Sequence, residues 1–270
     1  KPSAAEREAL PAGARAGLYE VLAREPRNAP IFQSFRFRPE QVQPWLRAVE
    51  LPDSHRARVA RLLYPSGRAM VFADQDTLCS QWEDAERAAL MRALATTPVE
   101  VVTLEVAEGQ PVDELAVYYG GGHKAAILPM LTALSRRPGG GTVDIAHLLP
   151  PFARERLYSY ARRTDPQASC HHAALNFLRD APEDRLLDER VATAELRSAY
   201  RVLGEDEPRR LGDIITIERP DGYVLHSMAY VAADVAFSKN GRYHYAPWGL
   251  YRVADLIALA TNRYTGTWIA

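Results

Sequence analysis

The chain has 270 residues, of which 47% are hydrophobic and 25% are charged, the composition of an ordinary globular protein. Its 33 basic and 34 acidic residues leave a net charge of −1, which excludes the strong positive field of a dedicated nucleic-acid-binding protein. No apolar stretch approaches the roughly 20 residues of a membrane-spanning helix, so we expect no integral membrane segment. At about 150 residues per domain, the length allows one large domain or two of ordinary size.

Two features of the sequence concern processing and redox state. The chain begins at Lys1 without a signal-peptide pattern, which fits a processed mature protein or a partial sequence. Its two cysteines, Cys79 and Cys170, are too few for a disulfide framework or a four-thiolate zinc site. We expect two free thiols, with Cys79 as a small residue of the core.

The first half of the chain is predicted to be a mixed α/β, helix-rich region. Residues 3–63 have the pattern of helices broken by turns, and Met70 to Ala73 form a short apolar run typical of a buried strand. The further elements expected are a helix over 81–95, a strand over 99–106 that is buried on both faces, and helices over 112–119 and 124–136. We place a domain boundary near Gly141 and expect a binding or regulatory role for residues 1–141.

The second half is predicted to be an α+β domain over residues 142–270, in which a helix packs on an antiparallel sheet. Helical patterns continue from 142 to 163 and return at 170–179. Strand patterns cover 211–217 and 223–231, with turns at 219–222 and at Asn240-Gly241. The sheet is therefore expected to follow the helix in the chain.

Cys170 is the candidate nucleophile of this domain. Ser169 is a suitable N-cap, which puts Cys170 in the first turn of its helix. Backbone N–H groups and the positive end of the helix dipole favour a thiolate there, relative to a free cysteine with a pKa of about 8.5. Because cysteine is also common as a buried core residue, a purely structural role is the alternative.

His226 is the candidate general base. It lies in the middle of the second predicted strand, on the face that alternation assigns to Val224, Met228 and Tyr230. A histidine on a rigid strand can accept the proton of a thiol at a helix start, and the order Cys, His, polar residue is that of papain-type enzymes.

These motifs together resemble the NlpC/P60-type branch of the papain-like cysteine peptidases and amidases. The resemblance is carried by Cys170 at a helix start, by Gly212-Asp213-Ile214-Ile215, and by His226 followed by Ser-Met-Ala-Tyr-Val. It covers about residues 169–259 and implies a papain-like fold and an amide substrate, with a cell-wall peptide as the first choice. The family often has Asp-Cys-Ser-Gly at the nucleophile, whereas this chain has Ser-Cys-His-His.

The resemblance implies a third catalytic residue on the strand after His226, where Ser238, Lys239 and Asn240 compete. A three-residue loop over 232–234 would pair Val231 with Val235 and put Asn240 opposite His226, with Ser238 on the same face. A two-residue loop would bring Lys239 to that face instead. Since a charged lysine cannot accept a hydrogen bond, Asn240 is the first choice and Ser238 the second.

The remaining candidates border the expected active site. The Cys170 backbone N–H and either Gln167 or Ser169 are expected to hold the oxyanion, and His171 and Tyr230 to contact substrate. Zinc bound by Cys170, His226 and the histidine pair 171–172 is an alternative, but adjacent helix residues point about 100° apart. We therefore expect neither a metal nor a cofactor.

The sequence thus predicts a cysteine hydrolase that cleaves amide bonds through an acyl-enzyme. An acyltransferase with the same Cys-His pair, and a non-enzymatic binding or scaffold protein with a degenerate site, are the alternatives. The expected partner is a peptide or cell-wall peptide, and a protein partner stays open. A cell-wall substrate would imply an extracytoplasmic location, with a cytoplasmic one as the alternative.

Overall fold

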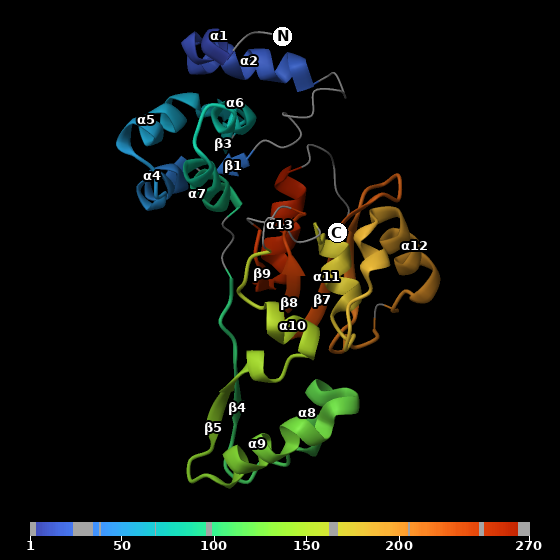
Figure 1. The fold of residues 1–270 in the computed structure, drawn as a ribbon. Helices are drawn as coiled ribbons and strands as arrows, with labels where there is room; N and C mark the ends of the chain where they lie inside the picture. Colours follow the sequence, from blue (N-terminus) through green and yellow to red (C-terminus); the bar gives the residue numbers. More distant parts are fainter. Residues whose placement is uncertain are drawn as a thin grey trace. The chain divides into compact units, whose positions relative to one another are not determined.

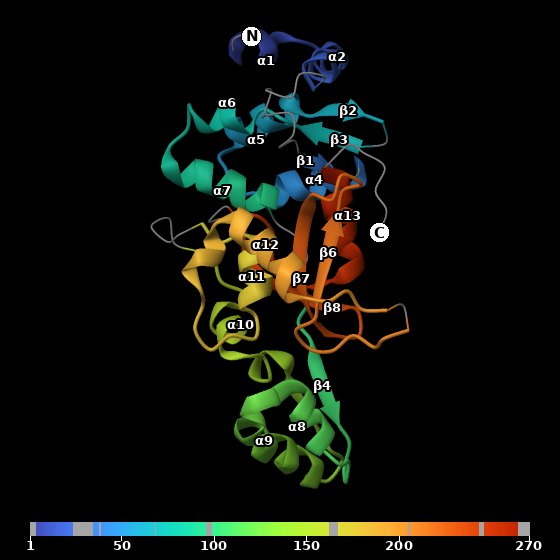
Figure 2. The same ribbon diagram turned by 90° about the vertical axis from the view of Figure 1, so that its right-hand side faces the viewer.

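The computed structural model describes residues 4–23, 35–37, 39–67, 69–95, 99–161, 167–204, 206–242 and 246–263. It is an α+β structure with three small antiparallel sheets in these ranges (Figures 1 and 2). Internal contacts divide the chain into unit 1, Lys1–Thr96 with Leu259–Thr267, and unit 2, Thr97–Ala258 with Trp268–Ala270.

Unit 1 consists of helices around a three-stranded sheet with the order β1-β3-β2. Its elements are α1 (Ala4–Ala9), α2 (Ala12–Ala23), β1 (Phe35–Phe37), α4 (Pro39–Ala48), α5 (Asp53–Leu62), β2 (Tyr64–Ser66), β3 (Ala69–Phe72), α6 (Gln75–Cys79) and α7 (Asp84–Ala95). β3 confirms the short strand expected near Met70, whereas α6 was not expected. The expectation that Cys79 is a core residue concerns a side chain outside the described set.

A buried carboxylate connects distant parts of unit 1. Asp74, which is 3% exposed, accepts hydrogen bonds from Tyr19 of α2 and, at 3.3 Å, from Nε of Arg7 of α1. Burial, followed by the contact with Asp74, raises the pKa of the Tyr19 phenol, which therefore acts as a hydrogen-bond donor. We call these three residues the Asp74 cluster.

Unit 2 begins with a β-α-α-β segment. Its elements are β4 (Thr103–Val106), α8 (Asp113–Gly120), a 3₁₀ turn (Gly121–His123), α9 (Lys124–Arg136) and β5 (Gly141–Asp144). The β4-β5 ladder pairs Val106 with Gly141, and α9 packs against both strands. Their buried residues share one core with residues of the later sheet, which is why the units divide after Thr96 and not near Gly141.

Two expectations for this segment are wrong. Val99 and Val101 are 40% and 72% exposed, so the strand is not buried on both faces; it belongs to a two-stranded sheet and begins only at Thr103. The helix expected over 142–163 is largely replaced by β5, a 3₁₀ turn (Ile145–His147) and the short α10 (Pro151–Arg156). Gly140 makes the strand pairing possible, because its φ is +73° and a Cβ there would lie 2.3 Å from the Val106 carbonyl oxygen.

The second part of unit 2 is a four-stranded antiparallel sheet with the order β6-β7-β8-β9. Its elements are α11 (Cys170–Asn176), a 3₁₀ turn (Asp184–Leu187), α12 (Glu189–Ala199), β6 (Ile214–Glu218), β7 (Val224–Ala232), β8 (Val235–Lys239), β9 (Trp248–Arg252) and the start of α13 (Val253–Arg263), whose residues from Leu259 belong to unit 1. α11 lies against β7 and β8 in both views (Figures 1 and 2). The expected helix on an antiparallel sheet is therefore present, while α12, β9 and α13 are additional elements.

Apolar contacts fix α11 on the sheet. Ala173 of α11 and Phe177, its C-cap, are fully buried in one core with Ala229 and Val231 of β7 and Phe237 of β8. The rings of Phe177 and Phe237 lie 5.5 Å apart between centroids. Burying such side chains stabilises the packing by about 1.5–3 kcal/mol each, so the start of α11 is held firmly against the middle strands.

Candidate active site

The helix start predicted at Ser169 is present. The Ser169 hydroxyl accepts a hydrogen bond from the His172 backbone N–H at 3.3 Å, which caps α11. Cys170 is the first residue of that helix and is only 7% exposed. The cap and the burial together hold the thiol at one place beside the sheet.

Cys170 lies between two histidines. His226 of β7 and the adjacent His171 both form hydrogen bonds with the thiol, and they are 6% and 3% exposed. Burial alone would raise the pKa of Cys170, but the two histidines outweigh it, and the pKa lies well below its ordinary value. The structure thus brings the predicted nucleophile and base together and adds a second ring.

Each of these histidines is hydrogen-bonded to a serine of the sheet. Ser238 Oγ lies 3.0 Å from Nε2 of His226, and Ser227 Oγ lies 2.8 Å from Nδ1 of His171. Both serines are fully buried. Because these bonds use one nitrogen of each ring, Nδ1 of His226 and Nε2 of His171 are left for the thiol.

The two histidines of the pair 171–172 have opposite environments. Burial lowers the pKa of His171, but Cys170 and then Glu189 more than reverse this effect, so its pKa is raised. His172 lies near Phe152, with ring centroids 5.9 Å apart, and burial lowers its pKa to about 4. His171 therefore belongs to the polar cluster around Cys170, whereas His172 is a buried neutral residue.

The third residue at His226 is Ser238, the second choice from the sequence, and the reason lies in the β7-β8 hairpin. Its turn has only two residues, since Ala232 pairs with Val235, and Ala233 has φ +51°. A bulge between Tyr230 and Ala232 then restores the register that a three-residue loop would give, pairing Tyr230 with Ala236. Without the bulge, Lys239 would share the face of His226.

Lys239 is nevertheless part of the surroundings of the thiol. Its side chain is fully buried, donates a hydrogen bond to the Gly241 carbonyl oxygen at 2.6 Å and lies 5.3 Å from the ring centroid of Trp248. Burial lowers its pKa to about 8, and the neighbouring Cys170 limits that fall. Asn240, the first choice for the third residue, is 5% exposed directly after β8.

The sequence placed Val224, Met228 and Tyr230 on the same face of β7 as His226 by strict alternation, but β7 is irregular next to the histidine. Ile217 pairs with His226, but Glu218 pairs with Val224, so a second bulge lies directly before the histidine. A bulge re-aims the side chains beside it, so strict alternation from Val224 does not fix the face of His226; Val224 itself packs with Leu175 of α11. Tyr230, expected to contact substrate, has Tyr118 and Tyr119 of α8 as electrostatic neighbours.

The expected oxyanion donors lie before α11. Gln167 is exposed three residues ahead of Cys170, and Ser169 uses its hydroxyl oxygen as the helix cap. Within the described ranges, no group of three or more His, Cys, Asp or Glu side chains is arranged so that it could hold a metal ion. Within the same ranges, Cys170 is a free cysteine, and none of the helices combines the length and hydrophobicity needed to cross a bilayer.

Comparison with known proteins identifies no relative, so any function has to be argued from the geometry of this site. Neither a protein-family model, nor a curated protein, nor a solved structure matches the chain. The sequence assigned no role to Ser227 and considered Lys239 only as the third residue at His226, although both lie on strands that carry a predicted site residue. Alternation along β7 could have indicated Ser227, because it is separated by one residue from the core residue Ala229.

Proposed function

We propose that the chain is a cysteine hydrolase that cleaves an amide bond through an acyl-enzyme on Cys170. The observation that carries the proposal is the buried thiol between two histidines, each hydrogen-bonded to a buried serine. An inert core cysteine needs no such surroundings. A nucleophile requires a base within hydrogen-bond reach and a group that orients the base, which are His226 and Ser238 here.

The reaction follows from the arrangement in two steps. The thiol proton passes to His226, the sulfur forms a bond to the amide carbonyl carbon, and the C–N bond breaks as the amine leaves with that proton. Water then gives a proton to His226 while its oxygen attacks the thioester, and the C–S bond breaks to release the acid and restore the thiol. The Cys170 backbone N–H, with Gln167 as the second donor, is assigned to the oxyanion.

A papain-like fold of the NlpC/P60 type is part of this proposal. Its support is the chain order of a cysteine-bearing helix, a histidine-bearing strand and a polar residue on the next strand, with the helix packed against the antiparallel sheet that contains both strands. By that resemblance the first substrate to test is a bacterial cell-wall peptide, which corresponds to an extracytoplasmic location.

The test is turnover of a panel of peptide amides that includes cell-wall peptides, with mass spectrometry of the intact protein. We expect product formation and transient acylation of Cys170 in the parent, and neither in Cys170→Ala nor in His226→Ala. Product release with an active Cys170→Ala protein would end the proposal. Release only in the presence of an added amine or lipid acceptor would identify an acyltransferase, and binding of the peptide without turnover a scaffold protein.

A further inference from the structure

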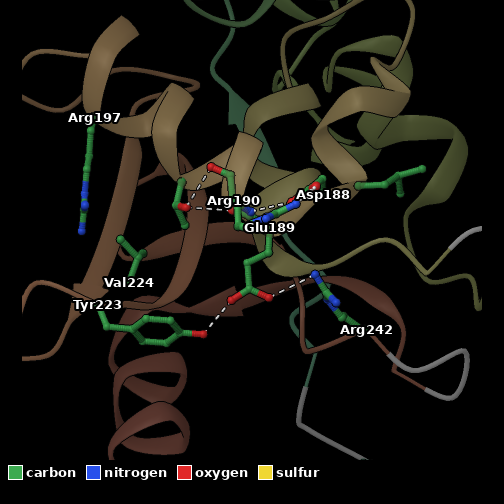
Figure 3. Close-up of a pocket in the computed structure, with 9 residues that line it drawn as sticks. Asp188, Glu189, Arg190, Arg197, Tyr223, Val224 and Arg242 are labelled. Carbon is green, nitrogen blue, oxygen red and sulfur yellow. Dashed lines mark hydrogen bonds and ion pairs between the residues drawn. The ribbon is translucent and has the colours of Figure 1, made fainter.

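A cavity of about 580 Å³ lies where the start of α12, the start of β7 and the segment after β8 meet (Figure 3). Its lining combines apolar and charged side chains: Leu187, Asp188, Glu189, Arg190, Thr193, Arg197, Tyr223, Val224 and Arg242. Its volume is that of a small-molecule site, which holds a ligand of a few residues. The proposed mechanism uses none of these residues.

The cavity lies beside the Cys170 site. Val224 is two residues before His226 on β7, and Arg242 is two residues after Asn240. Glu189 and Arg242 also act electrostatically on His171, whose ring contacts the thiol. A ligand in the cavity therefore has neighbours in common with the nucleophile.

The charges of the lining are unequal. Two carboxylates, Asp188 and Glu189, stand against the guanidinium groups of Arg190, Arg197 and Arg242, and 3 − 2 leaves one positive charge. Glu189 is neutralised in place, because Tyr223 donates to Oε1 at 2.6 Å and Arg242 lies 3.0 Å from Oε2 (Figure 3). Asp188 is paired with Arg190 at 3.3 Å.

Arg197 carries the positive charge that remains. Among the described residues, its only hydrogen-bond partner is the Gly222 carbonyl oxygen, which leaves its charge without a carboxylate. Figure 3 shows its extended side chain on the Val224 and Tyr223 side of the cavity, across from Glu189 and Arg242. A guanidinium with unused donors facing a cavity is suited to bind a planar anion.

We propose that this cavity binds a carboxylate of the substrate through Arg197, with Val224 and the Tyr223 ring contacting the chain that bears it. The inference rests on the proposed function, because it gives that enzyme a preference for amides with an acidic residue near the scissile bond. One uncompensated guanidinium matches one carboxylate, whereas a phosphate dianion would need a second positive charge.

The test uses the full chain and three peptidyl vinyl sulfones that differ only in having Glu, Gln or Lys at one position. Peptides with that position one, two or three residues from the electrophile cover the unknown spacing. We measure the rate of Cys170 modification, together with the rate for iodoacetamide, which reports the thiol without filling the cavity. The variants are Arg197→Ala and, as the matched control, Arg201→Ala, which removes an equal charge paired with Glu207 outside the cavity.

We expect the Glu probe to react about tenfold faster than the Gln probe at one spacing, the size of one charge-assisted hydrogen bond. The ratio falls to about one in Arg197→Ala and persists in Arg201→Ala. If the Glu and Gln probes react at equal rates with the parent, or if the tenfold difference persists in Arg197→Ala, the cavity proposal is overturned. Fast iodoacetamide labelling in the same experiment would still support the hydrolase. If iodoacetamide labels the parent no faster than a free thiol, the hydrolase fails. In that case, calorimetry measures the affinity of Cys170→Ala for the acetylated Glu and Gln peptides and tests the cavity independently of the reaction. Equal affinity for the two peptides rejects the cavity proposal.

Discussion

Each of the two units contains a buried polar cluster, and the clusters differ in whether their hydrogen bonds leave a base free to act on a nucleophile. In unit 1, Asp74 accepts hydrogen bonds from Tyr19 and Arg7, partners 55 and 67 residues away in the sequence. In unit 2, Cys170 lies between two rings whose outer nitrogens are bonded to neutral serines. The first cluster joins helices to a sheet, whereas the second leaves two bases directed at one thiol. Burial of polar groups therefore does not mark a reactive site unless a nucleophile and an available base are among them.

The largest expected effect is the loss of thiolate when His226 is removed. In His226→Ala the pKa of Cys170 rises toward the ordinary range, so alkylation by iodoacetamide at pH 6 falls about 100-fold or more, since each pH unit below the pKa costs a factor of ten. Mass spectrometry of the labelled peptide measures the rate. Asp74→Asn is the control from the other cluster and leaves the rate unchanged; an equal loss in both variants would remove the distinction between the clusters.

Asp74→Ala is expected to act on stability. The substitution removes the carboxylate that accepts hydrogen bonds from the Tyr19 hydroxyl and from Nε of Arg7, and losing one partner of a buried ion pair costs about 3–5 kcal/mol of unfolding free energy. Urea denaturation gives the value, and hydrogen exchange assigns the loss to unit 1. Asp84→Ala, which breaks an exposed ion pair with Arg87, serves as the matched control with an expected cost below about 1 kcal/mol. A cost of that size for Asp74→Ala would contradict the structural role.

His172 gives a pH dependence with a defined sign. Its pKa is about 4 in the folded protein and about 6.5 when exposed, so the unfolded chain binds a proton between these values that the folded chain does not. The stability contribution is complete above pH 6.5 and is lost as the pH falls to about 4, by roughly 3 kcal/mol. Denaturation at pH 7 and pH 4.5 in His172→Leu should show less of this loss than the parent. An unchanged acid dependence would place the titration elsewhere.

The smallest effects separate Ser238 from Asn240. Ser238→Ala removes the group at Nε2 of His226, and we expect about a tenfold loss in Cys170 alkylation rate at pH 6, the size of one hydrogen bond. Asn240→Ala should lose less than threefold. Near-ultraviolet circular dichroism of both variants checks that the fold is kept. The reverse order would return Asn240 to the role that the sequence first gave it.

Local patterns predicted much of this structure. α9 follows the expected limits, and the N-cap at Ser169, the helix at Cys170 and the two strands around residues 214–231 are present. These elements depend on caps, turn residues and apolar spacing, which are visible in a single sequence. The pair Cys170 and His226 followed from such local placement combined with the order of the motifs.

What the sequence did not show depends on contacts between distant segments. Residues 142–144 were expected to be helical because the helical pattern in the sequence extends over 142–163, although strand pairing with β4 determines residues 141–144. α12 has only a few buried residues, among them Ala192 and Leu196, so its apolar pattern is sparse. The sequence ranked Ser238 behind Asn240 because only the length of the β7-β8 loop was available to predict how these strands pair, and the bulge in β7 is not visible in the sequence.

The bulge at Val231 has a chemical consequence. A regular two-residue hairpin would turn the ammonium group of Lys239 toward His226, and the imidazolium of the proposed reaction would meet a like charge. One extra residue in β7 substitutes a hydroxyl that can both donate and accept, and thus follow the ring through either protonation state. The position of the bulge in β7 therefore decides whether Ser238 or Lys239 faces His226. The first arrangement supports proton transfer by the histidine, and the second opposes it.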